Sequence, residues 1–357
     1  MLISILIRFV RALTRQLPLL VLSVCLCSAD PLPKMPHGLI WQTSVNQDAS
    51  LRDEVELLLA QYEKQSGVLL RPGSRGKVAL KLNTRSGRGL ATPQPLIRAL
   101  VAAFEDRGFS RQSILLLDKS GYALNKAGFL TGIKERAQAN FEGCPVLALD
   151  SNAYFNPNWF YDSPLPGAMQ SEASVFYDQE ENHPKQLAND HVDRKSFLPM
   201  PLLMEVDFWI NLATVADDPV LGVDGALANA TLWNVGNSKR FMANEATASA
   251  ALAEIAAIPE LNERLIFHIV SLSRIQYIGG PFFNSHYLMR EPLLWLSSDA
   301  VALDRLIFDK INYQRMLDGF PLIDPLPRQF SFAASLNLGT CDTNEIHLQT
   351  VERVSPK

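Results

Sequence analysis

Apolar and polar positions follow two different periods along most of the chain. Short runs of branched apolar residues predict strands at 77–83, 113–118, 145–150, 204–215, 265–274 and 292–296. Between most of these runs, apolar residues recur at helical spacing and predict helices at 50–66, 93–107, 123–140, 222–233, 239–257 and 299–317. Such alternation is typical of a mainly parallel sheet with helices on both faces, so the pattern predicts an α/β fold.

One long segment, 151–201, interrupts this alternation. It is rich in Asn, Asp, Pro, Ser and aromatic residues and shows little periodicity. Loops of this length are usually functional or disordered, and its aromatic side chains argue against disorder. We therefore predict a long irregular excursion over the sheet, inside a single α/β domain that spans 30–330, with a C-terminal tail at 331–357.

The N-terminus has the pattern of an export signal. Three arginines precede the apolar run 17–26, and Cys27-Ser28-Ala29 offers small residues for cleavage before Asp30. The run is short for a membrane span, which needs about 20 apolar residues. We predict that 1–29 is removed and that the protein is periplasmic, with membrane contact only through the uncleaved segment. A retained anchor is the alternative.

Composition limits which partners and cofactors are expected. The 357 residues carry a formal charge of -4, so no basic surface for nucleic acid is expected. After removal of 1–29 only Cys144 and Cys341 remain, and two thiols cannot form a four-thiolate zinc or iron–sulfur site. The sequence thus predicts no iron–sulfur cluster, and the two cysteines are either buried small residues or one disulfide.

A glycine-rich turn joins the strand and the helix predicted within 78–104. Backbone N–H groups before a helix favour anions. The turn does not fit a dinucleotide fingerprint, because Thr92 stands where the third glycine should be. It does not fit a P-loop either. It is interpreted as a generic anion-binding turn that carries Arg85 and Arg88.

Three stretches resemble the bacterial and archaeal family known as the domain of unknown function numbered 362. They read KLNTRSGRGLATPQPLIRALVAAFEDRGF, DFWINLATVADDPVLGVDGALANATLWNVGNSKRF and LLWLSSDAVALDRLIFDKI, and with their spacing they cover Lys77 to Leu317. The resemblance implies an α/β domain with a lysine-x-asparagine strand end at Lys81 and Asn83. Many members add ferredoxin-like cysteine clusters, which this sequence lacks. Where many relatives have lysine-threonine-histidine, this chain has Ala216-Asp217-Asp218.

The carboxyl ends of the predicted strands carry polar residues, and ligands of open α/β sheets bind beyond those ends. The predicted catalytic residues are Asp118, Asp217 and Asp218. The predicted ligand-binding residues are Lys81, Asn83, Arg85, Arg88, Ser298 and Asp299. For each of them a structural role, such as capping a helix or closing a turn, is the alternative.

Two classes of function remain open. The first is an exported enzyme that acts on a small polar or anionic molecule, with a divalent cation between Asp217 and Asp218 as one version of it. The second is a non-catalytic periplasmic binding or assembly protein. His183 and His191 match no recognised metal motif, and His268, inside the apolar run LIFHIVSL, is interpreted as a satisfied core histidine.

Overall fold

The computed structural model describes residues 35–45, 51–130, 139–150, 152–163 and 194–352. The predicted export signal, the centre of the excursion and both of its histidines lie outside these residues. Within them, no helix is both long and apolar enough to cross a membrane.

The described residues form a large mixed sheet and a small separate one. The large sheet consists of β1 (Leu39–Ser44), β2 (Val78–Lys81), β3 (Ile114–Asp118), β4 (Asn140–Phe141), β5 (Cys144–Ala148), β8 (Phe208–Asp218), β9 (Gly222–Asp224), β10 (Leu265–Gln276), β11 (Leu288–Met289), β12 (Leu293–Ser297) and β13 (His347–Thr350). The small sheet pairs β6 (Phe155–Asp162) with β7 (Lys195–Pro199).

The centre of the large sheet is parallel, which confirms the predicted α/β class. Strands β10, β8, β2, β3 and β5 run side by side in the same direction. Strand β12 then pairs antiparallel with both β10 and β1, and β13 closes this edge parallel to β1. The long strand β8 is buried along almost its whole length, as expected for the middle of a sheet covered on both faces.

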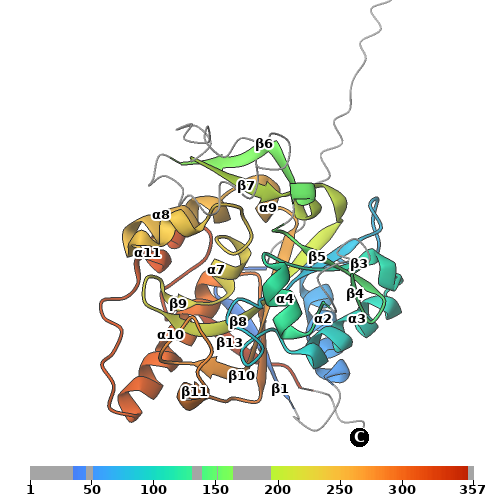
Figure 1. The fold of residues 1–357 in the computed structure, drawn as a ribbon. Coiled ribbons are helices and arrows are strands. Elements are labelled where there is room, and N and C mark those ends of the chain that lie inside the picture. Colours follow the sequence, from blue (N-terminus) through green and yellow to red (C-terminus); the bar gives the residue numbers. More distant parts are fainter. Residues whose placement is uncertain (1–34, 46–50, 131–138, 151, 164–193, 353–357) are drawn as a thin grey trace, which may run out of the picture. The chain divides into compact units, whose positions relative to one another are not determined.

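Helices cover both faces of the sheet (Figure 1). The helices are α2 (Arg52–Ser66), α3 (Gln94–Asp106), α4 (Gly121–Ala127), α7 (Ala226–Ala230), α8 (Glu245–Ala256), α9 (Pro259–Asn262), α10 (Ala300–Leu317) and α11 (Arg328–Ser335). Short turns of other helix types occur at Arg111–Ser113, Asn152–Tyr154, Pro201–Glu205, Lys239–Ala243 and Ser285–Tyr287.

Alternation along each strand divides the core into two layers. In β8, Ile210 and Leu212 pack with the apolar sides of α2, α3 and α4, whereas Trp209 and Ala213 pack with α7, α8, α10 and α11. Figure 1 shows α2 and α3 on one side of the fold and α8, α10 and α11 on the other. We call these the α3 face and the α7 face.

Several predicted boundaries need correction. The helix expected at 222–233 begins as β9, and α7 starts only at Ala226. Residues after 330, predicted as a tail, complete α11 and form β13, whose residues pair with β1 from Leu39 to Gln42. The described flanks of the predicted irregular excursion form the β6–β7 pair. Strand β1 and β13 carry too few periodic residues to stand out in the sequence, and they are stable because they extend an existing edge. Both Cys144, which is buried, and Cys341 are free thiols.

Candidate functional site

A row of polar side chains crosses the centre of the sheet on the α7 face. Lys81 of β2 pairs in register with Asn211 of β8, and Asn211 pairs with His268 of β10. All three are almost fully buried. Buried polar groups require partners, and α7 supplies one through Asn229, which lies over the row.

The Lys81 ammonium is the start of this row. Its Nζ donates to Asp118 Oδ1 at 2.7 Å, to Asn229 Oδ1 at 2.9 Å and to the carbonyl of Leu82 at 2.7 Å. Burial lowers the pKa of Lys81, while the charge of Asp118 and the hydrogen bond to it act in the opposite direction. An ammonium has three N–H donors and no acceptor, so the three oxygens around it use its whole capacity.

The remaining bonds run in one direction, from the lysine to the histidine. Asn229 Nδ2 donates to Asn211 Oδ1 at 2.7 Å, and Asn211 Nδ2 lies 2.8 Å from both the Ala226 carbonyl and His268 Nδ1. Because the ammonium can only donate, each amide must turn its NH₂ group toward the next residue. His268 Nδ1 is therefore the acceptor, and the ring proton is on Nε2. We call Lys81, Asn229, Asn211 and His268 the polar chain.

Asp118, predicted to be catalytic, anchors the glycine-rich turn. Its Oδ2 accepts from the backbone N–H of Thr84 at 2.7 Å and from the Thr84 hydroxyl at 2.6 Å, and its Oδ1 accepts from Lys119 N. Asn83, predicted to bind ligand, closes the same turn, because its N–H donates to Thr92 Oγ1 and its Oδ1 accepts from Arg85 N. Thr92, just before α3, does not cap that helix; its hydroxyl donates to Leu212 O at 3.0 Å.

Arg85 reaches from this turn to the β8–β9 hairpin. Its Nη1 pairs with Asp224 Oδ2 and lies 3.5 Å from Asp218 Oδ2, and its guanidinium stacks on Trp233 at 3.8 Å from the ring centre. Trp233 Nε1 in turn donates to Asp224 Oδ1. These contacts link the turn after β2 to the β8–β9 hairpin through one arginine.

The adjacent carboxylates Asp217 and Asp218 serve different parts of the fold. Asp218 Oδ1 accepts from the N–H groups of Val220 and Leu221, so it shapes the hairpin turn. Asp217 Oδ1 accepts from Gly280 N at 2.8 Å, and burial raises its pKa. Consecutive residues of a strand point to opposite faces, which accounts for the separate partners. Within the described residues, no group of three or more His, Cys, Asp or Glu side chains could hold a metal ion.

Ser298 and Asp299 lie toward the amino ends of β8 and β10, which corrects the expectation that they share the carboxyl end of β8 with Asp217 and Asp218. Strand β12 is antiparallel to β10, and its last residue, Ser297, pairs with His268 near the beginning of β10. Asp299 caps α10 through Ala302 N, and its Oδ2 accepts from Gly38 N and from Thr340 N. Asp299 is thus buried and structural, because it joins the start of α10 to the segments at Gly38 and Thr340.

An open groove on the α3 face gathers three arginines. It encloses about 930 Å³ between the glycine-rich turn, the beginning of α3 and the second half of β10. Arg88, Arg274 and Arg290 line it, and all three are exposed. Arg274 Nη1 donates to Gly89 O at 2.7 Å. In the part of the chain that the structure describes, none of the three forms an ion pair, and no Asp or Glu lines the groove.

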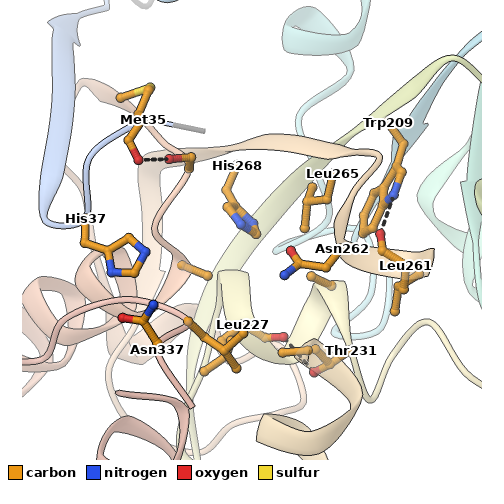
Figure 2. Close-up of a pocket in the computed structure, with 15 residues that line it drawn as sticks. Met35, His37, Trp209, Leu227, Thr231, Leu261, Asn262, Leu265, His268 and Asn337 are labelled. Carbon is orange, nitrogen blue, oxygen red and sulfur yellow. Dashed lines mark hydrogen bonds between the residues drawn. The ribbon is translucent and has the colours of Figure 1, made fainter. Parts of the chain in front are cut away.

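A smaller cavity of about 90 Å³ opens on the α7 face, where the polar chain ends. Figure 2 shows the rings of His37 and His268 and the amides of Asn262 and Asn337 around it. Ser298 also lines this cavity, and its hydroxyl donates to Met35 O. Of the residues predicted to bind ligand, Arg88 therefore lies in the groove and Ser298 in the cavity.

Comparison with known proteins adds little. No protein-family model and no curated protein matches the chain. Among solved structures, a Thermotoga maritima protein from a structural genomics programme is similar at 10% identity and a TM-score of 0.36, over 68% of this chain. The chain spans only 54% of that protein.

Sequence reasoning predicted Lys81 as a ligand-binding residue and His268 as a satisfied core histidine, but it missed the hydrogen bonds that join them and it missed Arg290. One signal for the chain was present: Asn211 interrupts the apolar run FWINLATV of a strand buried on both faces, and a buried amide must have partners. No comparable signal marks Arg290, because its neighbours in the groove come from distant parts of the sequence.

Proposed function

We propose that the protein binds a small anionic molecule in the arginine groove. The observation that carries this proposal is the set of Arg88, Arg274 and Arg290, which face one groove without a carboxylate partner among the described residues. By contrast, the half-buried Arg107 is paired with both Glu56 and Glu63. Three like charges repel one another, so an anion that bridges them reduces this repulsion and also forms new hydrogen bonds.

The surrounding groups suit an anion. Guanidinium groups bind carboxylate and phosphate oxygens in a bidentate manner. The first residues of α3 line the groove, and the first turn of that helix has no acidic residue, so no side-chain charge there opposes an anion. The hydroxyls of Ser271 and Ser273 on β10 add neutral partners. The volume of the groove lies within the range of about 300–1,000 Å³ that small-molecule sites occupy.

The proposal is compatible with an enzyme and with a binding protein. The catalytic roles of Asp118, Asp217 and Asp218, a divalent cation, export to the periplasm and membership in the domain of unknown function family 362 stay predictions. The structural contacts of the three aspartates favour binding as the first activity to test.

The test is a calorimetric titration with pyrophosphate and with citrate, which represent phosphate and carboxylate ligands. We expect binding that weakens as salt rises, because exposed charges are screened. Replacing Arg274 with Gln should weaken it by about 10-fold or more, since a charge-assisted hydrogen bond contributes about 1.5–3 kcal/mol. The Arg88→Gln/Arg290→Gln double variant should lose more.

The matched control is Arg98→Gln, which removes an exposed arginine of α3 that is paired with Glu142 and does not line the groove. This variant should bind like the unmodified protein. Absence of binding to both anions at low salt, or equal losses in the control and in Arg274→Gln, would refute the proposal.

A further inference from the structure

The arginine groove also carries an aromatic ring. Phe283, in the segment between β10 and β11, lines the groove and is 40% exposed. Within the described residues, its ring has neither an aromatic partner nor a cation over its face. By contrast, Tyr277 and Tyr287 of the same segment pack edge to face, with ring centres 6.0 Å apart. The Phe283 ring therefore offers a surface on which a planar ligand can stack.

The position of this ring is fixed through its backbone. Phe283 N donates to Ser86 O, in the glycine-rich turn, at 3.2 Å. On either side of it, the buried Gln276 side chain donates to Phe282 O at 2.8 Å and accepts from Asn284 N at 2.6 Å. A ring on a backbone held in this way loses little conformational freedom when a ligand binds, so more of the contact energy contributes to affinity.

A guanidinium lies beside the ring, because both contact Gly89. The Phe283 ring packs against Gly89, where an added Cβ would overlap the ring atoms, and Arg274 Nη1 donates to Gly89 O at 2.7 Å. Among the described residues Arg274 makes no other hydrogen bond or ion pair, so its remaining N–H groups can bind an anion. An anionic group held by Arg274 thus has an aromatic surface next to it.

The groove is much larger than an inorganic anion. It encloses about 930 Å³, and Val45, Leu51 and Leu294 give it an apolar wall. Small-molecule sites bury most of the surface of their ligands, so a ligand that fits has an apolar part beside its anionic group. Because three arginines face the same space, a doubly charged group gains more there than a singly charged one.

We propose that the groove binds a planar aromatic ring joined to a doubly charged anion, as in an aromatic phosphate ester. The ring stacks on Phe283, and Arg274 holds the anion together with Arg88 and Arg290. This inference rests on the proposed anion binding and adds the class of ligand. A saturated ring of the same size gains only the burial of its surface, whereas an aromatic ring also gains the interaction with Phe283.

The experiment is a calorimetric titration of the whole protein with phenyl phosphate and with cyclohexyl phosphate, which have nearly the same size and differ in aromaticity. At about pH 8 both are dianions, because the second pKa of a phosphate ester is about 6. We expect phenyl phosphate to bind about 3- to 10-fold more tightly, the range of one aromatic pair.

Two neighbouring variants locate the ring. In Phe283→Leu the preference for phenyl phosphate should fall below about 2-fold, while the affinity for pyrophosphate stays the same. The matched control is Phe282→Leu, which removes a ring that is 77% exposed and does not line the groove, and it should keep the preference.

The outcomes separate this inference from the proposed function. If pyrophosphate binds but the two esters bind equally, or cyclohexyl phosphate binds more tightly, the aromatic ligand class is overturned and anion binding stands. The full preference in Phe283→Leu, or an equal loss in both variants, would also overturn it. Absence of binding of pyrophosphate and of both esters would refute the proposed function as well.

Discussion

Replacing Lys81 with Met should destabilise the protein strongly. Methionine has a similar length but no donor, so the ammonium's three bonds to Asp118, Asn229 and Leu82 O are lost. Breaking a buried ion pair costs about 3–5 kcal/mol. Asp118 keeps three other donors, from Thr84 and Lys119. We therefore expect the lower part of that range, about 3 kcal/mol of the free energy of unfolding.

Equilibrium unfolding in urea measures this loss. A double-mutant cycle shows how much of it comes from the Lys81–Asp118 pair. Asp118→Asn removes the carboxylate that Lys81→Met leaves unpaired, so the double variant should lose less than the two single variants together, by about 1–3 kcal/mol. The control Lys77→Met removes a lysine that is 41% exposed and lies 3.7 Å from Glu205, and it should cost less than about 1 kcal/mol.

The same variant has a second readout at the other end of the polar chain. Without the ammonium, Asn229 is no longer forced to accept at Oδ1. The Ala226 carbonyl, which can only accept, still holds Asn211 Nδ2 at 2.8 Å, so the Nε2–H tautomer of His268 should persist in ¹⁵N spectra. A cost below about 1 kcal/mol for Lys81→Met, strictly additive losses, or an Nδ1–H tautomer would refute the directional reasoning.

Three further predictions concern other parts of the chain. Burial raises the pKa of Asp304 from 3.8 to about 7. The folded state therefore keeps a proton that the unfolded chain has released. The contribution of this proton to the free energy of unfolding is fully present below about pH 4 and is lost by about pH 7, a change of a few kcal/mol. Urea unfolding at several pH values measures it, and the change should be absent in Asp304→Asn. Burial raises the pKa of the Cys144 thiol to about 11, so iodoacetamide should label Cys341 in the native protein and Cys144 only after unfolding; rapid native labelling of Cys144 would contradict its buried position. Mass spectrometry of protein from the native envelope should show a chain that starts near Asp30, and full-length protein there would favour a retained anchor.

Local patterns predicted the types of most elements. The expected strands at 77–83, 113–118 and 265–274 correspond to β2, β3 and β10, and the helices expected at 93–107 and 299–317 correspond to α3 and α10. This agreement has a simple cause. The period of apolar residues is a property of neighbouring positions, and it directly reflects which faces of an element are buried.

The candidate site was predicted only in part. Asp118 and Arg85 do lie at strand ends beside Lys81 and Asn83, because the carboxyl ends of parallel strands meet at one edge. The roles of these residues did not follow from position. A carboxylate that caps a turn and one that contacts a ligand occupy the same place in the sequence pattern.

What the sequence determined by itself is therefore the class of fold, since alternating strand and helix periods require an α/β layer structure. Tertiary structure alone decided the direction of β12, which moved Ser298 away from the aspartates, and the register that aligned Lys81, Asn211 and His268. The physical reason is that register and direction depend on contacts between distant segments. The polar chain joins residues 148, 18 and 57 positions apart, and no local period encodes such partners.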